Sequence, residues 1–579
     1  MEKIKFKASS SDFSKIPGSP IAYWVSGQVF NVFETSNPLS TGDFAKVVTG
    51  MTTAGNENYL RLWHEIRAEK FTTKCLNNAE AAKSSYKWFP YQKGGDFRRW
   101  YGNNEFVVNW ENDGHAIKNN IDTDTGKVRS GSYNPEYVFS SGLTWTYISS
   151  SNFGVRFVPA GYLFDNKGSM IFCSAANDSK ILLGYLCTKL AFNISKILNP
   201  TLSFQPGDMA RVPVPVKLFS YLNIAELSAN CISISKSDWD SFETSWDFTS
   251  LPLLSANYRG ETLADTYSNI RAFWQNQTDE MKRLEEENNR IFIDAYGLND
   301  ELTPDVPLKE ITITCNPHYR YGDVDNLEGR LLFDTIQEFI HYGVGCMFGR
   351  YSLDKEGLIL ANQGETQDDY LAKIPNPSFM PDADNVLSIL SKDYFEDDIA
   401  TRFNEFLRIT FGKEKFTENL AFIENTLADN KAGKNIREYF QKSFFNYHVK
   451  RFKKRPIYWQ FESPKGSFKA LIYMHRYKPD QVSVILNDYL REFNNKITHE
   501  IESNQAILIT GNDIEKIKAQ KEIDRLIPIL RETSDWERDI IFPLAQARIE
   551  IDLDDGVKTN YPKFGKALTK IVGLDTKEE

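Results

Sequence analysis

The sequence has little of what metal or disulfide chemistry requires. Its six cysteines are scattered over 579 residues without a CxxC spacing, and its seven histidines show no HxH, HxxxH or HExxH spacing. Zinc sites use closely spaced ligands of these kinds, so we expect no metal site. Cysteines without a regular framework are typical of reduced thiols, which favours a cytoplasmic location. The cysteines are Cys75, Cys173, Cys187, Cys231, Cys315 and Cys346.

Long apolar runs and nucleotide-binding loops are also missing. No run approaches 18 uninterrupted apolar residues, so we expect no membrane-spanning helix and no membrane partner. The lysines of the first 20 residues are not followed by an apolar stretch, so no secretory signal is expected. The absence of a GxxxxGK[ST] motif excludes P-loop nucleotide chemistry. The one dense glycine cluster, residues 343–349, follows a helical pattern, and we interpret it as close helix packing.

Positive charge is in deficit over the whole chain, but not in every region. The formal net charge is −10 and the isoelectric point is near 5.5, which argues against a nucleic-acid partner. Residues 41–220, however, contain 20 lysines and arginines against 15 aspartates and glutamates. Residues 221–579 contain 44 against 60 and therefore carry the acidity. Such asymmetry predicts different partners for the two regions.

The pattern of apolar residues predicts an α+β protein. Residues 41–220 read as β-rich, because short apolar runs alternate with clusters of Gly, Asn, Asp and Ser. Residues 181–198 predict a buried helix, and the prolines of 211–216 end the region because they cannot occupy a central strand. The expected strands are 105–110, 153–158, 162–164 and 170–173.

Long helices are predicted after this region. Ten residues from Leu263 to Ala295 follow a heptad spacing with two polar interruptions, and a helix of that length spans roughly 50 Å. It fits either an amphipathic helix packed on its own domain or a rigid spacer that pairs with a partner. Further on, residues 482–501 and 514–530 have helical periodicity and could form a hairpin. Pro528 is expected to kink or end the second helix.

Three segments come close to the motif of adenine-N6 methyltransferases without completing it. Those enzymes hold the amine of a flipped adenine with an Asn/Asp-Pro-Pro-Tyr/Phe turn. The sequence contains Asn134-Pro-Glu-Tyr, Asn316-Pro-His-Tyr and Asn376-Pro-Ser-Phe, each without the second proline. A glycine-rich cofactor loop accompanies none of them. We therefore interpret all three as ordinary turns and assign no catalytic or cofactor-binding residue.

Two segments combine cations with aromatic rings. Residues 86–110 (YKWFPYQKGGDFRRWYGNNEFVVNW) contain nine aromatic residues and four cations. Arginines suit phosphates or guanine edges, and rings suit stacking on bases. An aromatic core strand with its arginines on a solvated face is an equally weighted interpretation. Residues 448–456 (HVKRFKKRP) contain five cations and predict either a phosphate clamp or a solvated helix end.

Long, ordered motifs connect these segments to a known family. Five of them are IPGSPIAYWVS (16–26), KWFPYQKGGDFRRWYGNNEFVVNWENDG (87–114), GLTWTYISSSNFGVRFVPAGYLFD (142–165), YGVGCMFGRYSLDKEGLILA (342–361) and KRPIYWQFESPKGSFKALIYMHRY (454–477). Together with further matches they run through nearly the whole chain. They resemble the C-terminal part of the PglX family, the adenine-specific DNA methyltransferases of BREX phage-defence systems.

The resemblance implies a chain without its catalytic half. In the family the methyltransferase domain precedes these segments, so its catalytic residues have no positions here, and S-adenosylmethionine is expected only in the missing half. We expect the DNA-recognition half of a site-specific enzyme, with double-stranded DNA and a methyltransferase half or other BREX subunits as partners. The implied regions are a connector (1–40), a target-recognition domain (41–220), a helical spacer (221–330) and a helical C-terminal domain (331–579).

The basic segments and the positive region supply the candidate contacts to DNA. The acidic residues 221–579 leave a second interpretation open, in which the chain is a protein-interaction module that docks other subunits of the defence complex. The candidate DNA-binding residues are Arg61, Lys87, Lys93, Arg98, Arg99, Arg156, Lys450, Arg451, Lys453, Lys454 and Arg455.

Overall fold

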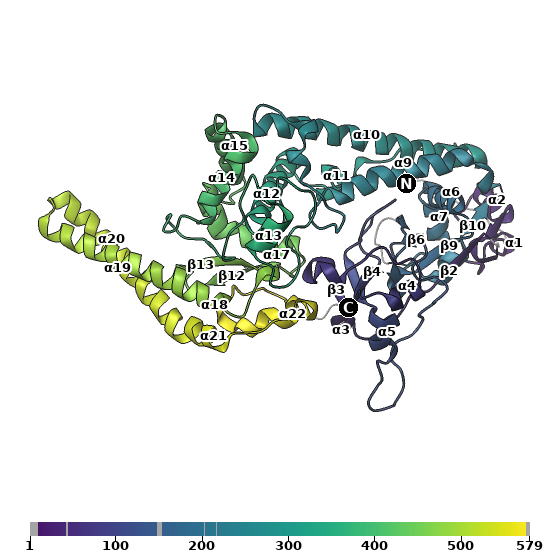
Figure 1. Cartoon of the computed structure of the whole chain (residues 1–579). Coiled ribbons are helices and arrows are strands. Elements are labelled where there is room, and N and C mark those ends of the chain that lie inside the picture. The colour runs from purple at the N-terminus through teal and green to yellow at the C-terminus, as the bar shows by residue number, and fades with distance from the viewer. Residues whose placement is uncertain (1–9, 42–43, 148–152, 202, 216, 575–579) are drawn as a thin grey trace. The chain divides into compact units, whose positions relative to one another are not determined.

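The computed structural model describes residues 10–41, 44–147, 153–201, 203–215 and 217–574 (Figure 1). Residues 1–9 of the predicted connector therefore lie outside the described residues. The chain divides into two compact units, each described by itself below. Helices dominate and the strands form small sheets, so the prediction of an α+β fold is confirmed. Unit 1 comprises Met1–Trp63, Lys70–Ser245 and Arg271–Leu327, and unit 2 comprises His64–Glu69, Trp246–Ile270 and Glu328–Glu579.

Unit 1 contains two four-stranded sheets and one short strand pair. The first sheet has the antiparallel order β2-β9-β6-β7, and the second has the order β3-β5-β4-β8, in which β8 runs parallel to β4. The four strands expected from the sequence are present. Strand bounds are β2 (Ala45–Val48), β3 (Leu60–Leu62), β4 (Trp88–Gln92), β5 (Phe106–Asn109), β6 (Gly142–Trp145), β7 (Val155–Val158), β8 (Leu163–Phe164) and β9 (Met170–Cys173).

The proline-rich segment after this region forms an edge rather than only a boundary. Strand β10 (Pro213–Pro215) pairs antiparallel with β1 (Ser36–Pro38), with Asn37 opposite Val214. A two-stranded pair leaves one side of each strand free, so a proline without an N–H can be accommodated. The β-rich region thus closes on the segment that precedes it in the sequence.

The buried helix predicted over 181–198 is two helices. Helix α6 (Ala176–Leu186) ends at Cys187, and α7 (Lys189–Leu198) starts after Thr188 at an angle of 76°. The Thr188 hydroxyl accepts a hydrogen bond from the Ala191 N–H at 3.1 Å, which caps the new helix and explains the break. Among the described residues no single helix is long and apolar enough to cross a membrane, and only this bent pair passes by length and composition.

The long helix expected from the heptad spacing is α10 (Leu263–Tyr296). Met281 and Leu284 of the predicted stripe are buried, but Ala295 at its end is exposed while Phe292 and Ile293 are buried. A straight α-helix has 3.6 residues per turn, so a 3.5-residue stripe rotates away from its contact surface over several turns. The part of α10 in unit 1 packs on that unit, as the first of the two interpretations states.

Shorter helices complete unit 1. Helix α9 contributes buried residues to the same core as α6, α7 and α10. The bounds are α1 (Ser10–Phe13), α2 (Gly27–Glu34), α3 (Asn56–Tyr59), α4 (Asn78–Lys83), α5 (Glu111–Lys118), α8 (Pro206–Ala210), α9 (Leu222–Asp240) and α11 (Pro317–Tyr321).

Unit 2 is mostly helical, as predicted, around one small sheet. Strand β13 (Lys469–Tyr473) lies between β11 (Leu387–Ser388) and β12 (Tyr458–Glu462), both antiparallel to it. The helices are α12 (Leu327–Met347), α13 (Gln367–Lys373), α14 (Ile399–Phe411), α15 (Phe416–Asp429), α16 (Ile436–Tyr439), α17 (Phe445–Arg451), α18 (Gln481–Val484), α19 (Arg491–Thr510), α20 (Asp513–Trp536), α21 (Phe542–Ala547) and α22 (Val557–Asn560).

The glycine cluster lies at a crowded contact of α12, which confirms close helix packing. A Cβ at Gly345 would lie 2.6 Å from Tyr351 Cδ2, and one at Gly343 would lie 3.1 Å from the ring of Phe406. Contacts below 3.0 Å force a neighbour to move, so Gly345 permits an approach that a larger residue would block.

Helices α19 and α20 form the predicted hairpin. The Asn512 side chain caps α20 by accepting hydrogen bonds from the Ile514 and Glu515 N–H groups at 3.1 and 3.0 Å. The sequence predicts a kink or an end at Pro528; α20 does not end there but continues to Trp536. Pro528 is exposed, so solvent can hydrate the carbonyl that loses its N–H partner.

Candidate nucleic-acid interface

The basic-aromatic segment 86–110 is part of the core of unit 1. Strands β4 and β5 occupy much of it, and most of its rings are almost fully buried. The rings therefore belong to the core, as one of the two interpretations of this segment predicts. Its arginines, however, do not lie on a solvated face: the exposed fractions of Arg98 and Arg99 are 3% and 7%. The buried rings are Trp88, Phe89, Tyr91, Trp100, Tyr101 and Trp110.

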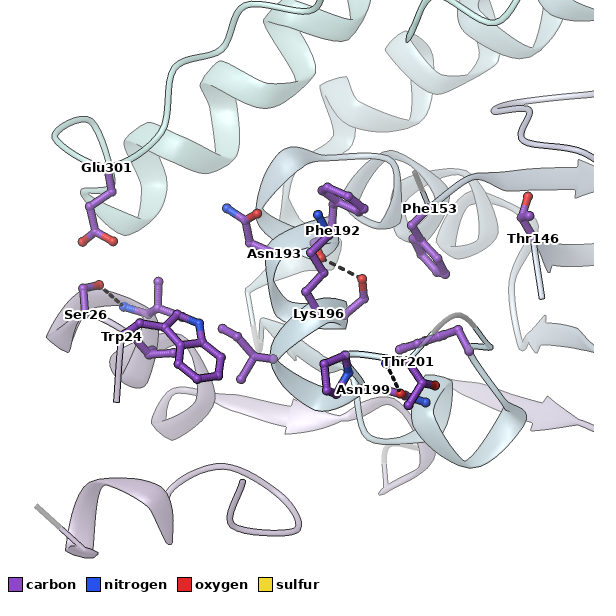
Figure 2. A pocket seen from close by; sticks show the side chains of 16 residues that line it. Trp24, Ser26, Thr146, Phe153, Phe192, Asn193, Lys196, Asn199, Thr201 and Glu301 are labelled. Carbon is purple, nitrogen blue, oxygen red and sulfur yellow. Dashed lines mark hydrogen bonds between the residues drawn. The ribbon is translucent and has the colours of Figure 1, made fainter. Parts of the chain in front are cut away.

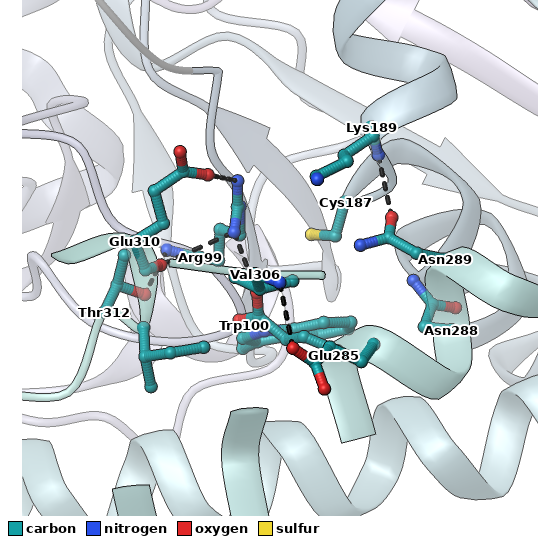
Figure 3. Close-up of polar contacts among 12 residues, drawn as sticks. Arg99, Trp100, Cys187, Lys189, Glu285, Asn288, Asn289, Val306, Glu310 and Thr312 are labelled. Atoms are coloured by element: carbon teal, nitrogen blue, oxygen red, sulfur yellow. Dashed lines mark hydrogen bonds and ion pairs between the residues drawn. The ribbon is translucent and has the colours of Figure 1, made fainter. Parts of the chain in front are cut away.

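Arg99 and Trp100 share a buried carboxylate on α10 (Figure 3). Arg99 Nη1 donates to Glu285 Oε2 at 2.7 Å, and Trp100 Nε1 donates to Glu285 Oε1 at 2.8 Å. A second acid, Glu310, accepts from Arg99 Nη2 at 3.2 Å. The backbone N–H of Arg99 donates to Thr312 Oγ1 at 2.9 Å. The turn that contains Arg99 and Trp100 is thus bound to α10 and to residues 310–312, which follow that helix.

Burial and pairing act in opposite directions on these charges. Burial raises the pKa of Glu285, and Arg99 and Trp100 oppose that rise. Burial alone would lower the pKa of Arg99, yet Glu285 and Glu310 hold it above its ordinary value. The Arg99 guanidinium and the two carboxyl groups thus compensate one another inside the protein. Because both terminal nitrogens of Arg99 donate to groups inside the protein, this guanidinium is not offered to an outside phosphate.

Arg98 is held by a second buried acid. Its Nη2 donates to Asp238 Oδ2 at 2.7 Å, its Nη1 to Thr314 Oγ1 at 3.0 Å and its Nε to the Tyr101 carbonyl at 2.8 Å. Asp238 also accepts from the backbone N–H groups of Thr314 and Cys315. Arg98 therefore fastens the turn after β4 to α9 and to the 312–316 segment.

Arg156, on β7, is the most deeply buried of the predicted contacts. It is 0% exposed, and Nη1 donates to the Arg98 carbonyl at 3.2 Å and to Thr146 Oγ1 at 3.1 Å. Burial lowers its pKa to about 10. The prediction that Arg98, Arg99 and Arg156 contact DNA is corrected by this geometry. The three arginines position the β-rich chain, because their guanidiniums point into the protein.

Arg61, Lys87 and Lys93 remain at the surface, and we call them the basic sheet surface. All three are half-buried and border the sheet β3-β5-β4-β8. Arg61 Cζ and Lys87 Nζ lie 5.6 and 5.2 Å from the centroid of the Trp88 ring, and Lys93 Nζ lies 5.0 Å from that of Phe106. Arg61 Nη1 also donates to the Glu57 and Leu60 carbonyls at 2.7 Å. Rings beneath cations hold long side chains in place at a surface.

Sequence reasoning missed one neighbour of this surface. Lys167 is exposed just after β8, and its carbonyl lies beside Gly94, where an added Cβ would approach it to 3.0 Å. Lys93 and Lys167 both act to lower the pKa of Asp165, although burial leaves that pKa raised, so the two cations lie near one carboxylate. Only the pairing of β8 with β4 brings residue 167 to residue 93, and no local signal could have indicated it.

The second basic segment lies at the end of α17 in unit 2, and the structure separates its members. Lys450, Lys453 and Lys454 are exposed. Arg451 Nη1 lies 3.3 Å from Glu338 Oε1, and Arg455, with 5% exposed, has Nε 4.0 Å from Glu65 Oε1. The lysines sit where the dipole of a helix C-terminus favours cations. The two arginines join elements of unit 2, so the prediction of a phosphate contact is corrected for Arg455.

The three near-motif asparagines have structural partners or an exposed position. Asn316 is 0% exposed and donates to the Leu308 and Ile311 carbonyls while accepting from the His318 N–H. Asn134 donates to the Thr49 carbonyl at 2.5 Å, and Asn376 is exposed. Within the described part of the chain, no group of three or more His, Cys, Asp or Glu side chains could hold a metal ion.

Comparison with known proteins gives these surfaces a context. No protein-family model matches the chain. Adenine-specific methyltransferase PglX of Lacticaseibacillus casei (strain Zhang) is 36% identical to it, and adenine-specific methyltransferase BrxX of Escherichia coli O9:H4 (strain HS) is 34% identical. The matches cover 98% and 97% of this chain.

Over nearly its whole length the chain is similar to these two adenine-specific methyltransferases. It spans about half the length of these curated relatives, because each match covers 46% of the relative. The resemblance inferred from the motifs is thereby confirmed.

Proposed function

We propose that this chain is the DNA-recognition half of a BREX-type, site-specific adenine-N6 DNA methyltransferase used in phage defence. The similarity to adenine-specific methyltransferases supports the enzyme class. The basic sheet surface is the observation that supports DNA binding. Catalysis and S-adenosylmethionine binding belong, in this proposal, to a methyltransferase half outside this sequence, so the chain alone does not methylate DNA.

The physical basis is charge placed on a rigid support. Arg61, Lys87 and Lys93 emerge from one sheet, and their side chains rest on rings, so little conformational entropy is lost when they meet phosphates. Phosphate contacts orient a protein on the duplex and make binding salt-dependent. The surrounding residues 41–220 have more basic than acidic side chains, which adds a long-range attraction.

A salt series tests this proposal. Anisotropy of a labelled random-sequence duplex is measured with the full chain between 50 and 300 mM salt. We expect the Arg61→Ala, Lys87→Ala, Lys93→Ala triple variant to bind more weakly, with a slope of log K against log salt shallower by about 0.9 for each lost phosphate contact.

The matched control removes three exposed lysines of unit 1 outside this sheet. The triple variant Lys46→Ala, Lys83→Ala, Lys217→Ala has the same loss of charge and should keep most of the slope. If both triple variants lost the same part of the salt slope, the loss would be explained by net charge and not by the basic sheet surface. Absence of DNA binding at 50 mM salt, with and without a separately supplied methyltransferase half, would refute the proposal. S-adenosylmethionine binding by the isolated chain in calorimetry would refute its non-catalytic part.

A second function, protein docking, is favoured by the tip of the α19–α20 hairpin. The exposed fractions of Ile509, Ile514 and Ile517 are 80%, 68% and 59%. Clustered exposed isoleucines are costly in water and are typical of interaction sites. We infer that this tip binds another BREX subunit. Purified subunits should co-elute with the wild type, and less with Ile509→Ser, Ile514→Ser, whereas Ile409→Ser on α14 should behave as the wild type.

A further inference from the structure

Unit 1 contains a cavity of about 560 Å³ beside helix α7 (Figure 2). Its described lining comes from the N-terminal segment 24–29, from α7 and the chain after it, and from Thr146, Phe153 and Glu301. The volume lies within the roughly 300–1,000 Å³ that small-molecule sites occupy. The cavity lies apart from the basic sheet surface, since none of the three residues of that surface lines it.

Aromatic rings form much of the cavity wall. Phe153 and Phe204 are buried and meet edge to face, with ring centroids 5.2 Å apart. Trp24 lines the same cavity from the N-terminal segment and is 51% exposed, so its indole is open to a ligand. Rings arranged around an open space offer stacking surfaces to a flat aromatic group.

Two polar side chains of α7 enter the same cavity. Asn193 and Lys196 are three residues apart and therefore share a helix face, as Figure 2 shows. Lys196 Nζ lies 4.1 Å from the centroid of the Phe192 ring, which holds its stem against the wall. Among the described residues, no carboxylate pairs with Lys196 and no group hydrogen bonds the Asn193 amide. An ammonium and an amide are thus available beside the rings.

We propose that this pocket binds a single nucleotide, with the base among the rings, its edge at Asn193 and its phosphate at Lys196. The amide can both donate to and accept from a base edge. The single ammonium matches a phosphate. Glu301 lines the same cavity and opposes a second negative charge, so a phosphodiester fits better than a doubly charged phosphomonoester. That preference indicates an unpaired nucleotide within a strand rather than a free nucleotide.

This inference goes beyond the proposed function, because the site is separate from the surface proposed for duplex phosphates. Binding at this cavity is distinguished from binding at the basic sheet surface by two labelled duplexes that differ only by one extra, unpaired adenine. We expect the full chain to bind the bulged duplex about tenfold more tightly at fixed salt, the order of effect of one stacked base. The 5′-methyl ester of dAMP, with dAMP as the doubly charged comparison, tests free nucleotides by saturation-transfer NMR.

Single variants of two cavity residues test whether the preference for the bulged duplex arises at this site. Trp24→Ala and Lys196→Met should each remove most of the preference for the bulged duplex, while affinity for the paired duplex stays within twofold. Lys217→Met, an exposed lysine outside the cavity, should keep the preference. Binding of the dAMP ester without a bulge preference, if sensitive to both variants, supports the site and identifies a free nucleotide as its source. No binding by any probe, or effects unchanged in both variants, would overturn the proposal.

Discussion

Removing the charge of Glu285, which pairs with Arg99 in the core, should lower the free energy of unfolding of unit 1 by several kilocalories per mole. Glu285→Gln keeps the size of the side chain and one acceptor for Trp100, but it removes the charge that compensates Arg99. Glu310 then remains as the partner of Arg99, at 3.2 Å and on a more exposed side chain. Breaking a buried pair from one side costs about 3–5 kcal/mol, because the other charge stays buried without compensation.

A matched control lies two residues away on the same helix. Glu287 pairs with Arg290 at the surface, where the side chains are 44% and 51% exposed. Glu287→Gln should cost less than about 0.5 kcal/mol, because exposed pairs contribute little. Both variants have the same charge change and the same helix position to within two residues, so burial is the main difference between them.

The assay must resolve unit 1 from unit 2, since a chain of two units need not unfold in one step. Hydrogen exchange read by mass spectrometry on peptides covering residues 96–101 reports the opening free energy of the tethered turn. We expect Glu285→Gln to lower that free energy by at least 2 kcal/mol and Glu287→Gln to leave it unchanged. Equal protection in the wild type and Glu285→Gln would refute the tethering role of Arg99 and reopen its assignment to DNA.

Further predictions concern packing, capping and pH. Gly345→Val should destabilise unit 2 by about 1–3 kcal/mol in thermal unfolding, because the side chain would overlap Tyr351, whereas Gly357→Val, next to open space, should cost only the strain of its positive φ. Asn316→Ala should cost about 1–2 kcal/mol through a lost helix cap and two freed carbonyls, and an unchanged melting temperature would contradict this. Burial and the neighbouring Asp384 carboxylate raise the pKa of Asp382 to about 8, so the stability contributed by its proton is complete below about pH 4 and is lost progressively as the pH rises from about 4 to 8. Urea unfolding of unit 2 between pH 6.8 and 8.5 should lose up to about 1.4 kcal/mol per pH unit, and Asp382→Asn should flatten that slope.

Much of the local structure could be predicted from the sequence. Heptad spacing indicated α10, and the helical periodicity of two consecutive segments indicated the α19–α20 hairpin. Short β-branched and aromatic runs indicated the strands of unit 1. These features depend on neighbours within a few residues, so periodicity and turn chemistry report them directly. The break at Thr188 and the passage of α20 through Pro528 depended on capping and exposure, which periodicity does not report.

Less of the candidate site than of the local structure could be predicted from the sequence. By itself, the sequence determined that residues 86–110 are rich in cations and rings and that the chain resembles one family over its length. Only the tertiary structure decided which cations face solvent. Arg98 and Arg99 meet Asp238, Glu285 and Glu310 from 140 to 211 residues away along the chain, whereas Lys93 in the same segment rests on a ring at the surface. The residue type of a cation is the same whether the side chain is buried against a distant carboxylate or lies at the surface. Burial with such a partner is a property of the folded chain alone.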